Sequence, residues 1–134
     1  MKKILITGSV MSTNSDSIYI YEKLDQICRE NGFEVSSPLD TMKFNGNDEE
    51  RYIRAMELIN STDYIIAEMS IPSTGQGMEL QQAIIKKIPI LIIAKENSKI
   101  SGLIKGSKGI VDILYYNDLE DIKENIIKSI CAIQ

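Results

Sequence analysis

Short apolar runs alternate along this chain with segments of helical spacing, and this alternation restricts the fold more than any other feature. The apolar runs predict strands at Lys3–Thr7, Phe33–Ser37, Asp63–Met69, Pro89–Ala94 and Ile110–Tyr115. Helical spacing predicts helices at Ser17–Asn31, Asp48–Ser61, Met78–Lys87 and Leu119–Ile133, with a short one at Ser98–Lys105. Polar residues predict loops at Asp40–Asn47 and Ser70–Gly77. Regular alternation of strands and helices indicates a parallel sheet with helices on both faces.

The strands are almost continuously apolar, as expected for strands covered on both faces. The chain length of 134 residues suits one domain over residues 1–134. Five strands favour a flavodoxin-like three-layer sandwich with strand order 2-1-3-4-5. In that order, ligands bind at the carboxyl ends of strands one and three. We therefore expect the loops Gly8–Asp16 and Ser70–Gly77 to flank the site.

Composition excludes several classes of function. The chain has no histidine, which excludes Ser-His-Asp triads and histidine-based zinc sites, and we expect neither a metal nor a cofactor. Its net charge of −4, with acids and bases interleaved, leaves no basic stripe for nucleic acid. No apolar run approaches the roughly 18 residues of a membrane span, and the first strand is too short for a signal peptide. We expect a cytoplasmic protein with Cys28 and Cys131 as free thiols.

The segment SIPSTGQGMEL, residues 70–80, is the sharpest candidate for a site. Gly75 and Gly77 allow the backbone to approach a ligand closely. Glu79 follows them, in the expected first turn of the next helix, where free N–H groups and partial positive charge gather. From position alone, Glu79 either takes part in chemistry or only complements the helix dipole.

Two other places at the same sheet edge carry polar groups. Glu68 ends the third strand, so it lies either at the site or already in solvent. Gly8 and Ser9 follow the first strand and open the hydroxyl-rich segment SVMSTNSDS. That segment either hydrogen-bonds a phosphate or caps the following helix.

The stretch DYIIAEMSIPSTGQGMELQQA, followed by PILIIA and ISGLIKG, resembles nucleoside 2-deoxyribosyltransferases, and ILITGS matches their first strand and turn. The resemblance covers nearly the whole chain and is strongest to the hydrolytic branch, the (deoxy)nucleoside 5′-monophosphate N-glycosidases. It implies that Glu79 attacks the anomeric C1′ carbon and that the base leaves from a covalent glycosyl-enzyme. Water then completes hydrolysis, or a second base completes transfer, as in retaining glycoside chemistry.

Three serines carry the resemblance to the hydrolytic branch. The transferases have an aspartate at the place of Ser73, whereas the monophosphate hydrolases use a serine there on the phosphate. Ser9 and Ser101 match phosphate-binding serines of the same branch. The resemblance also implies a homodimer, because the equivalent of Ser101 reaches the neighbouring subunit's site. The implied partners are therefore a nucleotide or nucleoside and a second copy of the chain.

The chain also departs from the family pattern. Leu5 stands where an aromatic residue is common, and Met11 stands where an arginine is common. A carboxylate of the helix before strand three aligns with Ala55 without a gap, or with Glu57 if that helix is shortened. Arg51, Arg54 and Lys105 are the candidate replacements for the arginine, and Glu68, Glu57 or water the candidate proton donors.

These departures leave three hypotheses open. A nucleotide N-hydrolase comes first, and a base-exchanging deoxyribosyltransferase with the same nucleophile second. The third is a nucleotide-binding module without catalysis. A receiver-like domain is disfavoured because the first loop lacks an acidic cluster for Mg²⁺.

Overall fold

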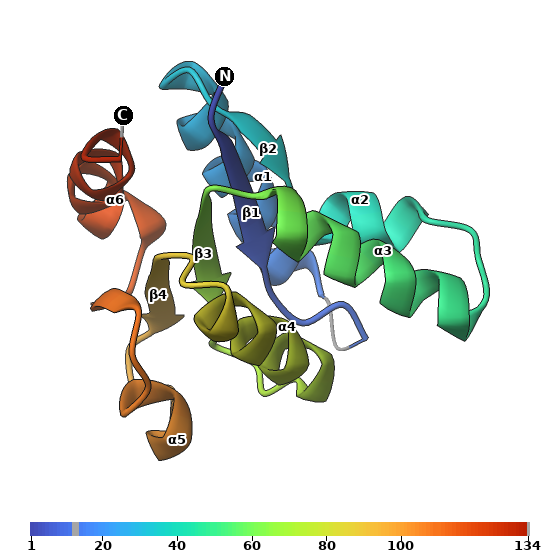
Figure 1. Ribbon diagram of the computed structural model, residues 1–134. Helices are drawn as coiled ribbons and strands as arrows, with labels where there is room; N and C mark the ends of the chain where they lie inside the picture. The colour runs from blue at the N-terminus through green and yellow to red at the C-terminus, as the bar shows by residue number, and fades with distance from the viewer. Residues whose placement is uncertain (12–13, 134) are drawn as a thin grey trace.

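The computed structural model describes residues 1–11 and 14–133, and it forms one five-stranded parallel sheet in the order β2-β1-β3-β4-β5 (Figure 1). Ser12 and Thr13 of the hydroxyl-rich segment lie outside the described residues. The predicted α/β fold and strand order are confirmed. The strands are β1 (Lys3–Thr7), β2 (Glu34–Ser36), β3 (Tyr64–Glu68), β4 (Ile90–Lys95) and β5 (Ile110–Tyr116). The helices are α1 (Ser15–Glu30), α2 (Pro38–Lys43), α3 (Asp48–Ser61), α4 (Thr74–Ile85), α5 (Gly102–Lys105), the 3-10 turn η1 (Leu119–Ile122) and α6 (Lys123–Cys131).

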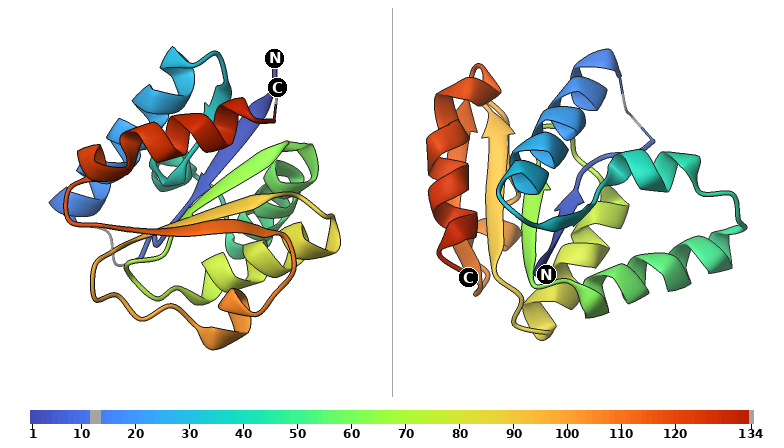
Figure 2. Two further views of the ribbon diagram at one scale, coloured as in Figure 1. Left: turned by 90° about the vertical axis from the view of Figure 1, so that its left-hand side faces the viewer. Right: turned by 90° about the horizontal axis from the view of Figure 1, so that it is seen from above.

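Helices cover both faces of the sheet and enclose two apolar cores. The left view of Figure 2 shows α1 and α6 above the sheet and α3, α4 and α5 below it. Alternate residues of each strand enter opposite cores because side chains alternate across a strand. Tyr64 and Ile66 of β3 pack in the α1–α6 core, whereas Ile65 and Ala67 pack in the α3–α4 core. Among the described residues, no helix has both the length and the apolar character needed to cross a bilayer.

From β1 the chain continues to β2 on one side of the sheet and then to β3 on the other. The switch point of the fold therefore lies between β1 and β3. β1 pairs with β2 on one side and with β3 on the other. Thr7, the last residue of β1, lies opposite Ala67 near the end of β3. The chain therefore leaves both strands at the same edge, and the loops before α1 and α4 start side by side.

The predicted loop Asp40–Asn47 is partly wrong, because α2 occupies Pro38–Lys43. Ser37 caps this helix through its hydroxyl, and the Asp40 carboxylate accepts a 2.9 Å hydrogen bond from the Ser37 backbone N–H. Proline at the first helical position completes the signal. The sequence pattern Ser-Pro-x-Asp therefore predicts the start of this helix.

Helix α4 begins at Thr74 instead of the predicted Met78. Its N-cap is Ser73, whose side-chain oxygen accepts a 3.3 Å hydrogen bond from the Gln76 N–H. The first turn includes two glycines, which have low helix propensity and led the sequence prediction to a loop. As a result Glu79 lies in the second turn of α4, which corrects its predicted place in the first turn.

Candidate active site

A cavity of about 470 Å³ opens at the carboxyl ends of β1 and β3. Its walls come from the β1–α1 loop, α2, α3, and the loop and first turns of α4. Five of the residues predicted to form the site line this cavity: Gly8, Ser9, Ser73, Gly75 and Glu79. The structure thus brings the two predicted loops together around the carboxylate of Glu79.

The environment of Glu79 disfavours its charged form. The side chain is only partly exposed, and burial raises the pKa of Glu79 to about 7, although the nearby charge of Arg54 acts in the opposite direction. Desolvation outweighs the partial positive charge of the helix N-terminus here, because the carboxylate lies one turn beyond the free N–H groups. A carboxylate with a pKa near neutrality in a cavity has the properties of a reacting group.

Gln76 is a residue of the site that sequence reasoning missed. It is 1% exposed, and its Nε2 donates to Thr7 Oγ1 at 3.0 Å and to the Glu68 backbone oxygen at 3.1 Å. Its Oε1 is the one buried side-chain polar atom without a hydrogen-bond partner among the described residues. The amide therefore ties the first turn of α4 to the ends of β1 and β3. A glutamine between two glycines carries no sequence signal for this role.

Gly8 is required by close packing at the turn after β1. A Cβ atom at this position would lie 2.3 Å from the hydroxyl oxygen of Tyr21. That hydroxyl donates a 2.9 Å hydrogen bond to the Ser9 backbone oxygen and so holds the loop against α1. In contrast, a Cβ added at Gly75 or Gly77 would meet no atom within 4 Å. Gly75 instead leaves the backbone of the first turn of α4 open to the Glu79 cavity, whereas Gly77 faces the neighbouring cavity.

Glu68 faces the other side of the sheet and does not line the Glu79 cavity. It is 5% exposed and lies beside α1, next to a separate cavity of about 500 Å³. Its carboxylate accepts hydrogen bonds from the Ser70 N–H at 2.7 Å, from the Ser70 hydroxyl at 2.9 Å and from the Tyr116 hydroxyl. The side chain is thus neither in solvent nor beside Glu79. It anchors the start of the loop that leads to Ser73.

The remaining predicted residues lie outside the Glu79 cavity. Ser101 and Gly77 line a neighbouring cavity of about 700 Å³ between α3, α4 and α5. Glu57 is exposed on α3 and is not part of either lining, whereas Ala55 faces the Glu79 cavity. Of these two aligned positions only Ala55 lines the cavity, and no carboxylate occupies the described part of its α3 wall. Arg51 lines this wall one turn earlier.

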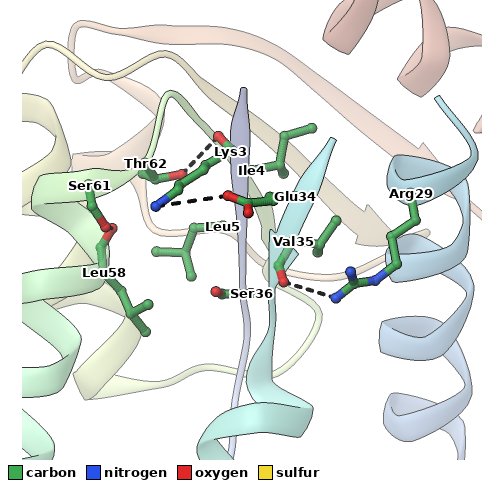
Figure 3. Close-up of a pocket in the computed structure, with 10 residues that line it drawn as sticks. All are labelled: Lys3, Ile4, Leu5, Arg29, Glu34, Val35, Ser36, Leu58, Ser61 and Thr62. Carbon is green, nitrogen blue, oxygen red and sulfur yellow. Dashed lines mark hydrogen bonds and ion pairs between the residues drawn. The ribbon is translucent and has the colours of Figure 1, made fainter. Parts of the chain in front are cut away.

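A further hollow of about 340 Å³ lies at the opposite end of the sheet, beside β1, β2 and the end of α3 (Figure 3). Its charged groups interact with one another or with backbone. Lys3 pairs with Glu34 at 3.9 Å, and Arg29 donates to the Val35 backbone oxygen at 3.1 Å. This hollow lies at the amino-terminal ends of the strands and holds no predicted site residue.

The chain is similar to known proteins in sequence and in fold. No family model matches the sequence. A protein of Methanosarcina mazei named "Putative 2'-deoxynucleoside 5'-phosphate N-hydrolase 1" is 30% identical over 98% of this chain and 86% of its own length. A CMP N-glycosidase from Clostridium botulinum has a TM-score of 0.70 at 18% identity, over 93% of this chain and 98% of its own. A 2-deoxyribosyltransferase from Bacillus psychrosaccharolyticus has a TM-score of 0.70 at 21% identity, over 90% of each chain. At these identities the two structures show a shared fold.

Proposed function

Because the chain belongs to the 2′-deoxynucleoside 5′-phosphate N-hydrolase family, within the nucleoside 2-deoxyribosyltransferase-like proteins, we propose that it hydrolyses the N-glycosidic bond of a (deoxy)nucleoside 5′-monophosphate. The products are the free base and the sugar 5-phosphate. The observation that carries the proposal is the cavity at the switch point. It combines a partly buried carboxylate, Glu79, with the hydroxyls of Ser9 and Ser73.

Glu79 is the proposed nucleophile. An oxygen of its carboxylate forms a bond to C1′ as the C1′–N bond breaks, and the base leaves with the bonding electron pair. Water then attacks C1′, its hydroxyl group stays on the sugar, its remaining proton passes to solvent, and Glu79 is released as a carboxylate. A pKa of about 7 leaves about half of the Glu79 groups ionised at neutral pH.

Solvent water is the proposed source of the proton that the leaving base takes up. Glu68 is hydrogen-bonded on the α1 side of the sheet, and Glu57 is exposed outside the cavity lining. Neither carboxylic acid is placed beside Glu79, so the departing base is protonated from the open side of the cavity. Bases that leave readily without a strong acid are accordingly the favoured substrates.

Neutral donors at the start of α4 are proposed to hold the phosphate. The Ser73 oxygen accepts a hydrogen bond from the Gln76 N–H, which leaves the Ser73 hydroxyl hydrogen for a ligand. Ser9 and the open first turn of α4 add hydroxyl and backbone N–H groups to the same wall. This arrangement favours monophosphates over nucleosides.

Free base is expected to appear when the protein is incubated with a panel of ribo- and 2′-deoxyribonucleoside 5′-monophosphates. We expect kcat/KM to be at least about 10-fold higher for the best monophosphate than for its nucleoside, because each neutral hydrogen bond contributes about 0.5–1.5 kcal/mol. Chromatography of the free base measures both. Equal kcat/KM values for the monophosphate and its nucleoside would exclude a role of Ser9 and Ser73 in binding the phosphate. A new nucleoside 5′-monophosphate formed on adding a second base would identify a transferase.

A second copy of the chain is the proposed occupant of the apolar face beside the site. Large side chains are exposed on α3, α4 and α5, including Met78 at 54%, Ile85 at 63% and Leu103 at 88%. The cavity lined by Ser101 shares Met78 with the Glu79 cavity, so the two open next to each other. A twofold contact here would cover the apolar side chains and allow Ser101 of the partner subunit to complete the phosphate site.

Leu103→Asp is expected to convert a dimer into a monomer and to lower kcat/KM for monophosphates by about 10-fold or more, because a charge would be buried at the contact. Sedimentation velocity and the base-release assay measure the two effects on one sample. Tyr19→Asp is the matched control, since Tyr19 is 54% exposed on α1, on the opposite face. A wild-type protein that sediments as a monomer and remains active would exclude the dimer.

A further inference from the structure

The charges of the Glu79 cavity are unbalanced once a nucleotide enters. Among the described residues of its lining, only Glu79 and Arg51 carry a charged side chain. A monophosphate adds about −1.5 to −2 charge at neutral pH. Hydroxyls and backbone N–H groups form weaker bonds to a phosphate than a cation does. The β1–α1 loop supplies only uncharged groups to the described lining, and the one cation of that lining is Arg51 on α3.

Arg51 is held at the cavity wall with most of its donors unused. Its guanidinium lies over the ring of Phe44, 5.7 Å from the ring centre, and donates one 3.3 Å hydrogen bond to the Phe44 backbone oxygen. No ion pair among the described residues involves Arg51. A guanidinium has five N–H groups in a planar fork, which suits two-point binding of a phosphate.

Arg54 lies against the same ring but differs from Arg51 in its hydrogen-bond partner and in its position relative to the cavity. Its guanidinium is 5.3 Å from the centre of the Phe44 ring and donates a 2.9 Å hydrogen bond to Thr41 Oγ1. Arg54 is not part of the cavity lining, and its charge acts on Glu79 by lowering the pKa of that carboxyl. The two arginines share one packing partner, and only Arg51 reaches the space a ligand would fill.

The geometry points to Arg51 as the cation that binds the substrate's 5′-phosphate, an inference that rests on the proposed function. Arg51 makes the site selective for phosphorylated substrates, whereas Arg54 adjusts the nucleophile. Phe44 positions both guanidinium groups from the loop between α2 and α3.

Arg51→Met is expected to lower kcat/KM for each 2′-deoxynucleoside 5′-monophosphate by about 10- to 100-fold, the range for a lost charge-assisted hydrogen bond. The nucleosides without phosphate should change by less than about 2-fold. Arg51→Lys should recover part of the loss because it keeps the charge without the planar fork. The matched control is Arg54→Met, which loses the same contact with Phe44 and should keep the wild-type ratio of monophosphate to nucleoside activity. An equal loss on both substrates, or an equal change of this ratio in Arg54→Met, would overturn the inference.

Binding of 2′-deoxyribose 5-phosphate separates this inference from the proposed function, because this probe carries the phosphate and needs no turnover. Calorimetric titration should give the wild-type protein and Arg54→Met similar Kd values, and Arg51→Met a Kd at least about 10-fold higher. A wild-type protein that binds the probe through Arg51 but releases no base would disprove the hydrolase and keep the phosphate site. Equal Kd values for all three proteins, or no binding by the wild type, would overturn the role of Arg51.

Discussion

Glu79→Gln is expected to lower base release by about 10,000-fold or more while the protein remains folded. Glutamine has nearly the same shape as glutamate, but its amide does not form the covalent bond to C1′ that the mechanism requires. Loss of a covalent nucleophile typically has effects of this size. The measurement is single-turnover release of free base from the best monophosphate, with circular dichroism as the test of folding.

Glu57→Gln is the matched control for this experiment, because Glu57 is an exposed glutamate on α3 outside the cavity lining. It should keep wild-type activity. Wild-type kcat/KM should also rise with pH through about 7, as Glu79 ionises. A Glu79→Gln protein that retains more than a few per cent of wild-type activity would show that Glu79 is not the nucleophile.

The same substitution is expected to stabilise the fold at pH 8. The pKa of Glu79 is about 7 in the folded protein against an ordinary value of 4.5, so the folded state binds this proton more tightly than the unfolded chain. Stability therefore falls as pH rises from about 4.5 to 7 and stays lowered above that range. The difference of 2.5 units corresponds to at most about 3 kcal/mol, which Glu79→Gln should recover.

Urea unfolding of the wild type and of Glu79→Gln at pH 4.5 and pH 8 measures this effect. The free energies of unfolding of the two proteins should differ little at pH 4.5, where both folded forms are neutral at position 79. The difference should be largest at pH 8. From the sequence, a glutamate in the first turn would have favoured the helix by about 0.3–1 kcal/mol, and its removal would have cost stability. A loss of stability in Glu79→Gln at pH 8 would show instead that Glu79 stabilises α4 through the helix dipole.

The sheet was predictable because its strands are apolar runs that leave little alternative to burial on both faces. Strand order and the two loops at the switch point followed from the alternation of elements. The missed helix α2 depended on a local cap formed by Ser37 and Asp40. The start of α4 was hidden by Gly75 and Gly77, whose low helix propensity is overcome by the Ser73 cap.

Within the site, chain order predicted which loops meet but not which side of the sheet each side chain occupies. Glu68 shares its face with Tyr64 and Ile66, so the two-residue period of β3 already directs it away from the α3–α4 layer. The pKa of Glu79 and the placement of Arg51 depend on how α3 packs against α4. These are tertiary properties that no local pattern in the sequence encodes.

The bridge made by Gln76 has an evolutionary consequence. The Gln76 amide stabilises the fold only while the Thr7 hydroxyl and the Glu68 backbone oxygen accept its hydrogen bonds. Its buried oxygen has no hydrogen-bond partner and lowers the stability of the folded state. Replacing Thr7 alone by valine would leave one N–H of the Gln76 amide without an acceptor, because Nε2 would keep only its bond to the Glu68 oxygen. Replacing both residues by apolar ones would remove this cost together with the bridge. We therefore expect positions 7 and 76 to vary together, so that across related sequences a polar residue at one accompanies a polar residue at the other.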